Sequence, residues 1–367
     1  MASTRFRSIT SDHMAWFGKQ SKDGPAQSTP RSDRSSAPDF GFPDEPFGDP
    51  DLLLENNQSN EPAVLTARVY GEKTTFGSVP WWSEKDWWKL APEGEANDVR
   101  CQVGTYADLA VAAVSLRGNK HRLQGAVNDD SYAIAHTTGD DGRGYLLVAV
   151  SDGMGSAKHS SFGARLAAQN ALRVLLKLLA DLPGNGLMAD LTEHQADLLS
   201  WITREVLGYR ANEFGAPTVD ANEFDSADAQ CTLTFAIVPT GEPTRSREAV
   251  IGIVGDSPAF LVQNGRLTPI EPAKDLEGLW SSSSDGLLGA TSMVITSVEL
   301  EPGDGLLLTS DGIGNFLTHG DQETVLGLDI ASRWKRPVGM LDFIRDASFE
   351  LQSADDDRTA VMIWIDE

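Results

Sequence analysis

The sequence has only two cysteines, Cys101 and Cys231, and they lie far apart in a chain of 367 residues. With no Cys-x-x-Cys pair and no accompanying histidine set, the sequence supports neither a disulfide framework nor a zinc site. It also lacks any run of about 18 apolar residues, and its first residues do not lead into the apolar core of a signal peptide. We therefore expect a soluble cytoplasmic protein with no membrane partner.

Basic residues are scarce relative to acids. Lys and Arg number 30 against 54 Asp and Glu, which gives a formal net charge of −24 at pH 7. This charge repels a polyphosphate backbone over most of the surface, so nucleic acid is not an expected partner. Acids have a second use, because hard divalent cations take oxygen ligands. Charge alone leaves a metal site and a solvated acidic surface both open.

Composition divides the chain into three parts. Residues 1–60 are rich in Ser, Pro, Gly, Asp and Asn without a sustained apolar period, which predicts a disordered polar tail that either binds a partner or solubilises the protein. Residues 61–105 form an extension with four of the nine tryptophans between positions 81 and 88. That apolar surface either packs on or beside the neighbouring domain or docks another protein. Residues 106–367 form the main domain.

Apolar periodicity predicts the elements of this domain. Strands are expected over Asp108–Leu116, Ser131–Ala135, Tyr145–Val150, Thr232–Val238, Ala249–Val254, Ala259–Val262, Met293–Leu300, Gly305–Leu308 and Ala360–Ile365. Helices are expected over Ser160–Leu182, Thr192–Tyr209 and Val338–Leu351. Runs of strands interrupted by a helix pair favour an α+β layered domain with antiparallel sheets, because a parallel sheet needs a helix at nearly every crossover.

Aspartates border four of these strands. Two strands end in Ser-Asp-Gly, at residues 151–153 and 310–312, where glycine permits a sharp turn and the close approach of a ligand. Asn128-Asp129-Asp130 precedes a third strand, and Asp355-Asp356-Asp357 precedes a fourth. Gathered carboxylates repel one another, so divalent cation binding is a natural reason to collect several. The alternative is four unconnected turn aspartates that bond to their own backbone.

In chain order, from about Asp108 to the C terminus, the motifs resemble the metal-dependent serine/threonine phosphatases of the protein phosphatase 2C family. The motifs that resemble the family's Asn-Glu-Asp, Asp-Gly-Met-Gly, Gly-Asp-Ser, Ser-Asp-Gly and Asp-Asn-x-Thr are, respectively, Asn128-Asp129-Asp130, Asp152-Gly153-Met154-Gly155, Gly255-Asp256-Ser257, Ser310-Asp311-Gly312 and Asp356-Asp357-Arg358-Thr359. The resemblance implies a protein phosphatase 2C-like αββα sandwich of two antiparallel sheets flanked by helices.

The same resemblance implies a metal site. Asp152 would bridge two Mg²⁺ or Mn²⁺ ions, the Gly153 carbonyl would bind one of them, and Asp130, Asp311 and Asp356 would complete the set. Asp130, Asp152 and Asp311 are thereby implied as the catalytic residues, and a water that bridges the ions as the nucleophile.

Two further roles follow from the resemblance less directly. Family members often carry an aspartate for a third ion shortly before a strand that here begins at about residue 230, and of Asp225 and Asp228 we favour Asp228. The family's phosphate-binding arginine, expected near Gly125, is missing. His121 and Arg122 stand slightly upstream, as in a bacterial subgroup, and are the expected phosphate-binding residues.

The function implied is hydrolysis of phosphoserine and phosphothreonine in proteins, opposing a Ser/Thr kinase in a bacterial signalling pathway. One alternative is a catalytically weak or inactive regulatory protein of the same fold that binds phosphoprotein partners, which the missing arginine favours. Another is a phosphatase for a small phosphorylated metabolite. Pro258, in place of the usual arginine after Gly-Asp-Ser, indicates a divergent branch.

Overall fold

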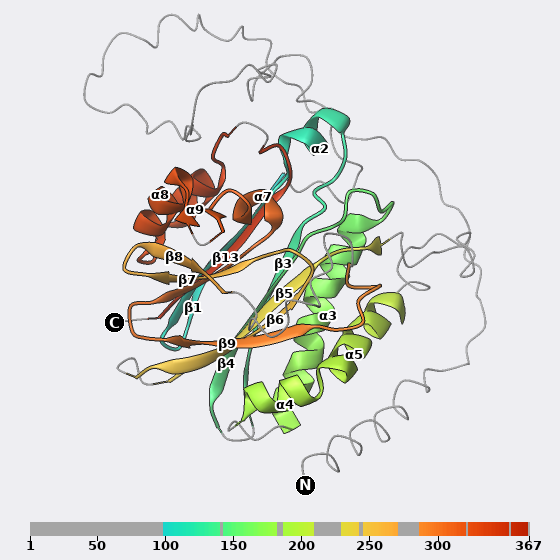
Figure 1. The fold of residues 1–367 in the computed structure, drawn as a ribbon, viewed down its shortest axis with the longest axis vertical. Coiled ribbons are helices and arrows are strands. Elements are labelled where there is room, and N and C mark those ends of the chain that lie inside the picture. The colour runs from blue at the N-terminus through green and yellow to red at the C-terminus, as the bar shows by residue number, and fades with distance from the viewer. Residues whose placement is uncertain are drawn as a thin grey trace, which may run out of the picture. The chain divides into compact units, whose positions relative to one another are not determined.

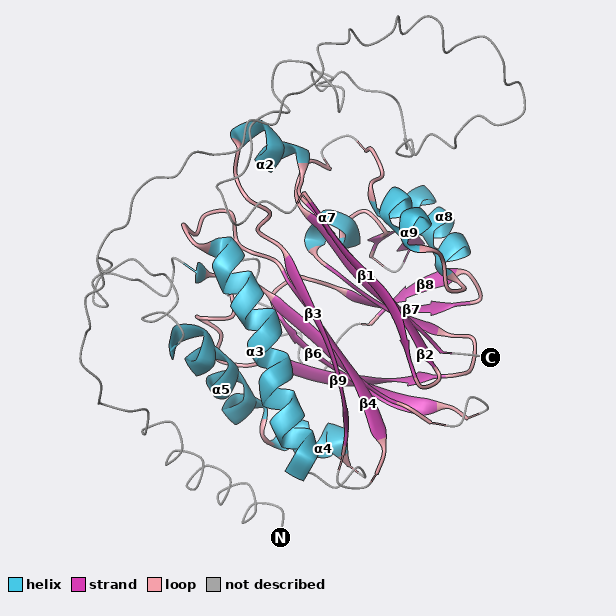
Figure 2. Cartoon of the chain, turned by 180° about the vertical axis from the view of Figure 1, so that it is seen from behind, coloured by secondary structure: helices cyan, strands magenta, loops and turns pink. Residues whose placement is uncertain are grey.

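The computed structural model describes residues 98–139, 142–181, 186–208, 229–241, 245–270, 286–320, 322–351 and 354–365. The predicted tail, the clustered tryptophans and Asp228 lie outside the described residues. Within the described part, two antiparallel sheets pack face to face and helices cover their outer faces (Figures 1 and 2). The predicted α+β sandwich of two antiparallel sheets flanked by helices is confirmed.

The first sheet has the strand order β1-β2-β13-β10-β7-β8. These strands are β1 (Val99–Tyr106), β2 (Leu109–Leu116), β7 (Ala259–Gln263), β8 (Arg266–Pro269), β10 (Gly305–Thr309) and β13 (Arg358–Ile365). Strands β10 and β13 are buried on both faces, which explains why their sequences are continuous apolar runs. Strand β1, which the sequence pattern did not predict, pairs with β2 over its whole length. Residues 99–105, assigned from the sequence to the extension, are therefore part of this sheet.

The second sheet has the order β3-β4-β5-β6-β9. Its strands are β3 (Ser131–Thr138), β4 (Gly144–Ser151), β5 (Leu233–Pro239), β6 (Arg247–Val254) and β9 (Val294–Leu300), and a separate small ladder joins β11 (Thr318–His319) to β12 (Gln322–Glu323). The facing sides of the two sheets share one apolar core, which includes Val111, Tyr132, Val148, Ile251, Leu308 and Ile363. Burial of this area supplies the main driving force that holds the sheets together.

Helices cover both outer faces. They are α3 (Ser160–Asp181), α4 (Leu187–Glu193) and α5 (Gln195–Gly208) beside the second sheet, and α8 (Val325–Trp334) and α9 (Met340–Ala347) beside the first (Figure 1). Two short helices, α2 (Asn119–Gln124) and α7 (Asp311–Gly314), lie toward one end of the sheets. None of the helices in the described ranges is long and apolar enough to cross a membrane.

Helix boundaries were the weakest part of the sequence prediction. The helix expected over residues 192–209 is α5, which begins three residues later, and the short helix α4 before His194 was not predicted. The helix expected over residues 338–351 is shorter, and α8 was missed because Gly327 weakens its helical signal. A Cβ at Gly327 would lie 2.0 Å from the Leu317 carbonyl oxygen, so tertiary packing requires glycine there.

A second glycine makes a testable contact in the core. Gly252 in β6 pairs with Phe235 in β5, and a Cβ at residue 252 would lie 2.2 Å from Phe235 Cζ. We expect Gly252→Ala to lower the free energy of unfolding by about 1–3 kcal/mol, because the ring must move in a close-packed core. Chemical denaturation measures this loss. Gly104→Ala is the control, since a Cβ there meets nothing within 4 Å, and an equal loss in both variants would contradict the explanation.

Candidate metal centre

Four chain-distant aspartates stand at strand ends near one end of the sandwich. Asp130 precedes β3 and Asp152 follows β4, and these antiparallel neighbours pair at Ser131 and Ser151. In the other sheet, Asp311 follows β10 and Asp356 precedes β13, which are also paired. Antiparallel pairing brings the end of one strand beside the start of the next. Each sheet therefore contributes one pair of acids.

The four carboxylates act on one another electrostatically. Burial raises the pKa of Asp152 well above its ordinary value, and the charges of Asp130, Asp311 and Asp356 raise it further. Burial likewise raises the pKa of Asp130 well above its usual range, with Asp357 and Asp311 adding to the effect. The pKa of Asp311 is raised mainly by burial, and the charges of Asp256 and Asp356 raise it further. Gathered carboxylates that disfavour one another's charge are a setting that a divalent cation relieves.

The donor set fits hard divalent cations. Asp130 is 8% exposed, and its Oδ2 is buried and accepts no hydrogen bond from the described residues. A buried, unpartnered carboxylate oxygen is costly. Among the described residues, no three Asp, Glu, His or Cys side chains are already arranged as they would be around a bound metal ion. Mg²⁺ usually keeps several waters and takes only one or two carboxylates, so an open set of oxygen donors suits it.

The backbone of the Asp152 loop is held by Thr232, which directly precedes β5. The Asp152 N–H donates to Thr232 Oγ1 at 3.0 Å, and the Thr232 N–H donates to the Asp152 carbonyl at 2.8 Å. Thr232 Oγ1 also lies 2.6 Å from Ser257 Oγ, so the predicted Gly-Asp-Ser motif supports the site through its serine. A Cβ at Gly153 would lie 2.6 Å from the Asp129 carbonyl oxygen, so glycine is required at this turn.

A chain of hydrogen bonds links the motifs that contain Asp311, Asp356 and Asp130 through their non-acidic residues. Ser310 N–H donates to the Thr359 carbonyl and Thr359 N–H donates to Ser310 Oγ, both at 2.9 Å. Thr359 Oγ1 donates to Ser115 Oγ at 2.8 Å, and Asn128 Nδ2 donates to the same oxygen at 2.9 Å. Asn128 Oδ1 in turn accepts the N–H of Asp130 at 2.9 Å. The non-acidic residues of the motifs thus position the acids.

Asp357, to which the sequence analysis gave no role, supports the segments around the site through hydrogen bonds. Its carboxylate, 3% exposed, accepts the N–H of Gly118 at 2.6 Å and the N–H of Asp129 at 2.5 Å. Its Oδ2 also lies 2.8 Å from His121 Nδ1, and this hydrogen bond raises the pKa of His121. One buried carboxylate therefore ties together the starts of α2, β3 and β13. The adjacent Asp356 is half-exposed, and its charge acts on Asp152 and Asp311.

The two predicted phosphate-binding residues, His121 and Arg122, have different surroundings from each other: the first is buried and the second is partly exposed. The His121 ring is buried against Asp357, with Nε2 3.8 Å from Asp129 Oδ2. Burial lowers the pKa of Arg122, and the charges acting on it include Asp98 and Arg117 rather than the four aspartates. The contact of either residue with phosphate stays a prediction.

The fold is a two-sheet sandwich, and the candidate site is a cluster of carboxylate oxygens at one end of it. The protein phosphatase 2C family profile matches residues 117–340, more than half of the chain. The chain therefore belongs to the protein phosphatase 2C family. No curated protein resembles it closely enough to count as a match.

Solved structures of bacterial phosphatases are similar to the chain. The catalytic domain of the serine/threonine phosphatase PstP in complex with two manganese ions is 21% identical, with 71% of this chain and 99% of that chain covered and a TM-score of 0.45. PstP/Ppp of Mycobacterium tuberculosis is 20% identical (72% and 100% covered, TM-score 0.43). Stp1 of Staphylococcus aureus is 17% identical (72% and 98% covered, TM-score 0.44).

Proposed function

We propose that this protein is a metal-dependent phosphoprotein phosphatase that hydrolyses phosphoserine and phosphothreonine at a two-metal site. One observation carries the proposal: Asp130, Asp152, Asp311 and Asp356 stand at four strand ends from two sheets, with Asp130 buried and the other three partly exposed. Membership of the protein phosphatase 2C family supports it. The four aspartates and the Gly153 carbonyl are the proposed ligands of Mg²⁺ or Mn²⁺. Asp228 remains the proposed ligand of a third ion.

Each residue has a task that follows from its position. Bound divalent cations would supply the positive charge that activates water and stabilises the phosphoryl oxygens. Asp152 interacts with acids from both sheets, which suits it to bridge two ions. Asp130 and Asp311 hold the cluster from opposite sheets, and the hydrogen bonds beneath them limit reorganisation during the reaction.

A cysteine mechanism does not fit the same place. Cys231 precedes β5 and forms an isolated β-bridge with Gly153, but burial raises the pKa of its thiol to about 12. A thiolate nucleophile requires a lowered pKa and access to the substrate. The carboxylates are therefore the groups at this site that suit phosphate-ester chemistry. The proposed substrates are phosphorylated proteins, and the proposed signalling partner is a Ser/Thr kinase.

The test is hydrolysis by the purified full-length chain. We expect para-nitrophenyl phosphate and a phosphothreonine peptide to be hydrolysed in the presence of Mn²⁺ or Mg²⁺, with no turnover in EDTA, because the acids need a cation to bind a phosphate ester. A small phosphorylated metabolite, such as a sugar phosphate, is the comparison substrate. Preferred hydrolysis of the metabolite would contradict the phosphoprotein assignment. Absence of turnover at every metal concentration would contradict the proposal that the protein is an enzyme.

One observation favours the second candidate, a regulatory protein that binds phosphoproteins without turnover. Gly125, close to where the family's phosphate-binding arginine is expected, ends α2 with a positive φ of 70°. This conformation suits glycine and places no long side chain there. Binding of a phosphothreonine peptide together with no hydrolysis at any metal concentration would support this candidate.

A further inference from the structure

We propose that Lys120 binds the phosphoryl group of the substrate and so takes the part of the missing arginine. The inference rests on the proposed function, because it concerns the same site. It assigns a residue of α2 that neither the sequence motifs nor the metal ligands include.

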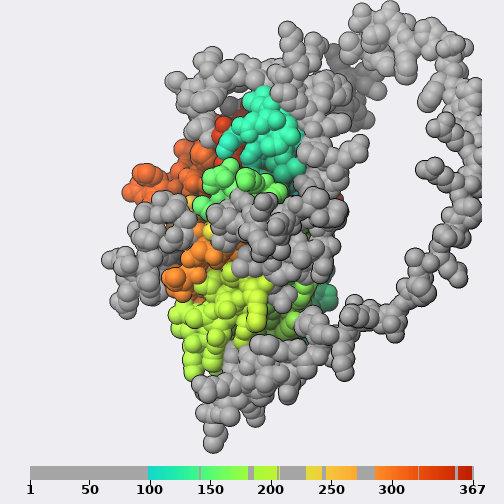
Figure 3. Space-filling view, turned by 90° about the vertical axis from the view of Figure 1, so that its right-hand side faces the viewer, coloured from blue at the N-terminus to red at the C-terminus, as the bar shows by residue number. Residues whose placement is uncertain are grey.

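Lys120 lies between two of the acidic loops. Its Nζ is 4.0 Å from Asp356 Oδ2 and 3.9 Å from the place that a Cβ on Gly155 would take. Gly155 follows Asp152 by three residues, so the ammonium lies beside both the β4 loop and the β13 loop. The Lys120 N–H donates to the Asp355 carbonyl at 2.9 Å, which holds the start of α2 against the second loop. In Figure 3 the teal surface around α2 adjoins the green surface that follows β4.

The other two cations of α2 have different tasks. His121 is buried and bonded through Nδ1 to Asp357. Arg122 is partly covered, and the charges of Asp98 and Arg117 act on it. The Lys120 side chain is 42% exposed, so a phosphorylated substrate can reach it. An ammonium has three N–H donors, and one long ion pair with Asp356 leaves donors for phosphoryl oxygens.

Charge balance gives the same assignment. Four carboxylates would just neutralise two divalent cations, so a phosphoryl dianion needs a further positive group. A cation bound by Asp356 weakens the attraction of that carboxylate for Lys120, which lets the ammonium turn to the substrate. Gly155 has no side chain, and Lys120 Nζ is the one atom of the described residues within 4 Å of the place its Cβ would take, so residue 155 does not cover the ammonium.

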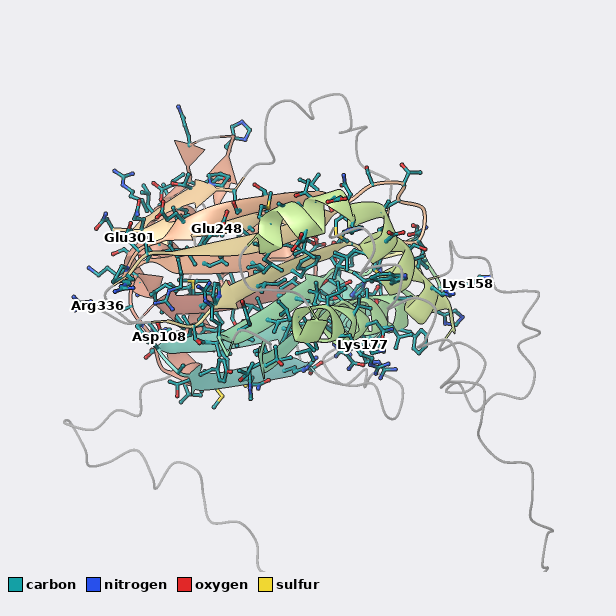
Figure 4. The ribbon with its side chains drawn as sticks, turned by 90° about the horizontal axis from the view of Figure 1, so that it is seen from below. Asp108, Lys158, Lys177, Glu248, Glu301 and Arg336 are labelled. Atoms are coloured by element: carbon teal, nitrogen blue, oxygen red, sulfur yellow. The ribbon has the colours of Figure 1, made fainter. Side chains whose placement is uncertain are left out.

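Four forms of the full chain test the proposal: wild type, Lys120→Gln, Lys120→Arg and the control Lys335→Gln. Lys335 is exposed at the end of α8, and its substitution by Gln removes the same positive charge. It is next to Arg336, which lies at the opposite end of the sheets from Lys158 in Figure 4. Lys158 follows the Asp152 loop, so the control is remote from the site.

The measurements are the KM for para-nitrophenyl phosphate, the inhibition constant of inorganic phosphate and the Mn²⁺ concentration for half-maximal activity. We expect Lys120→Gln to raise the KM and the inhibition constant about tenfold, the effect of losing one hydrogen bond to a charged group. The Mn²⁺ requirement should not rise, Lys120→Arg should restore most of the phosphate affinity, and Lys335→Gln should behave as wild type. If Lys120→Gln changes only the Mn²⁺ requirement, Lys120 merely tethers Asp356 and the proposal is wrong.

Calorimetric binding of inorganic phosphate to the Mn²⁺-loaded protein separates this inference from the proposed function. If wild type shows no turnover, the phosphatase fails as a proposal. Phosphate binding that is weakened in Lys120→Gln but not in Lys335→Gln would still support Lys120. Absence of phosphate binding to Mn²⁺-loaded wild type, or equal binding to wild type and Lys120→Gln, would overturn it.

Discussion

Asp152→Asn is expected to lower kcat for para-nitrophenyl phosphate by about a thousandfold or more at saturating Mn²⁺. The amide keeps the size of the side chain but loses the charge that would hold two cations. Asp256→Asn is the matched control, because Asp256 is exposed at a turn and is not a proposed metal ligand. Its charge does act on the nearby Asp311, whose pKa it raises. The control variant should keep most of the activity. Similar losses in both variants would mean that Asp152 has no special position among the acids.

The same variant is expected to be more stable than wild type when both are free of metal. Burial and neighbouring charges raise the pKa of Asp152 in the folded state, whereas its unfolded value is about 3.9. The stability contributed by its proton is complete below that pH and is lost as the pH rises through the folded value. Asparagine carries no charge to repel its neighbours, so in EDTA at neutral pH Asp152→Asn should melt at the higher temperature.

Melting curves across pH complete this test. The difference between the metal-free proteins should shrink as the pH falls through the folded pKa and should be smallest below about 4, where the wild-type carboxyl is protonated in the folded state and increasingly in the unfolded state. Added Mn²⁺ should raise the melting temperature of wild type by mass action and change that of the variant much less. A variant that melts below wild type in EDTA at neutral pH would contradict the repulsion inferred for the cluster.

Asp357→Ala is expected to lower the free energy of unfolding by about 3–5 kcal/mol, the range for removing one partner of a buried charged network. The change leaves the N–H groups of Gly118 and Asp129 without their carboxylate acceptor and removes the partner of His121. The affinity for Mn²⁺ should fall as well, because Asp357 holds the segments that carry Asp130 and Asp356. Urea denaturation and metal titration measure the two effects.

Two further variants serve as comparisons for Asp357→Ala. Asp357→Asn resembles the family's Asp-Asn-x-Thr motif and keeps one oxygen acceptor, so its loss should be intermediate. Asp355→Ala changes an exposed neighbour whose backbone carbonyl still accepts the Lys120 N–H, and it should change stability little. If Asp357→Ala and Asp355→Ala were equally stable, the three contacts of Asp357 would contribute nothing and its supporting role would be wrong.

The amino-acid sequence by itself determined the layered fold class and which short motifs carry the acids. Each of these signals is local. Continuous apolar runs predicted the buried strands β4, β10 and β13, and a glycine directly after Asp152 and after Asp311 marked turns that need close backbone approach. The edge strand β1 and helix α8 were not predicted, because an edge strand that is largely exposed and a helix that contains glycine have weak local patterns.

Only the tertiary structure decided the environment of each acid in a motif. In the run Asp355-Asp356-Asp357 three identical side chains differ in environment: the first is exposed, the second is half-exposed and its charge acts on Asp152, and the third is buried. The third is distinguished by hydrogen bonds to Gly118 and Asp129, which are 239 and 228 residues away in the chain. The position of Lys120 beside Gly155 and Asp356 likewise arises from three separate segments. Such roles depend on contacts between distant segments, which local sequence patterns do not encode.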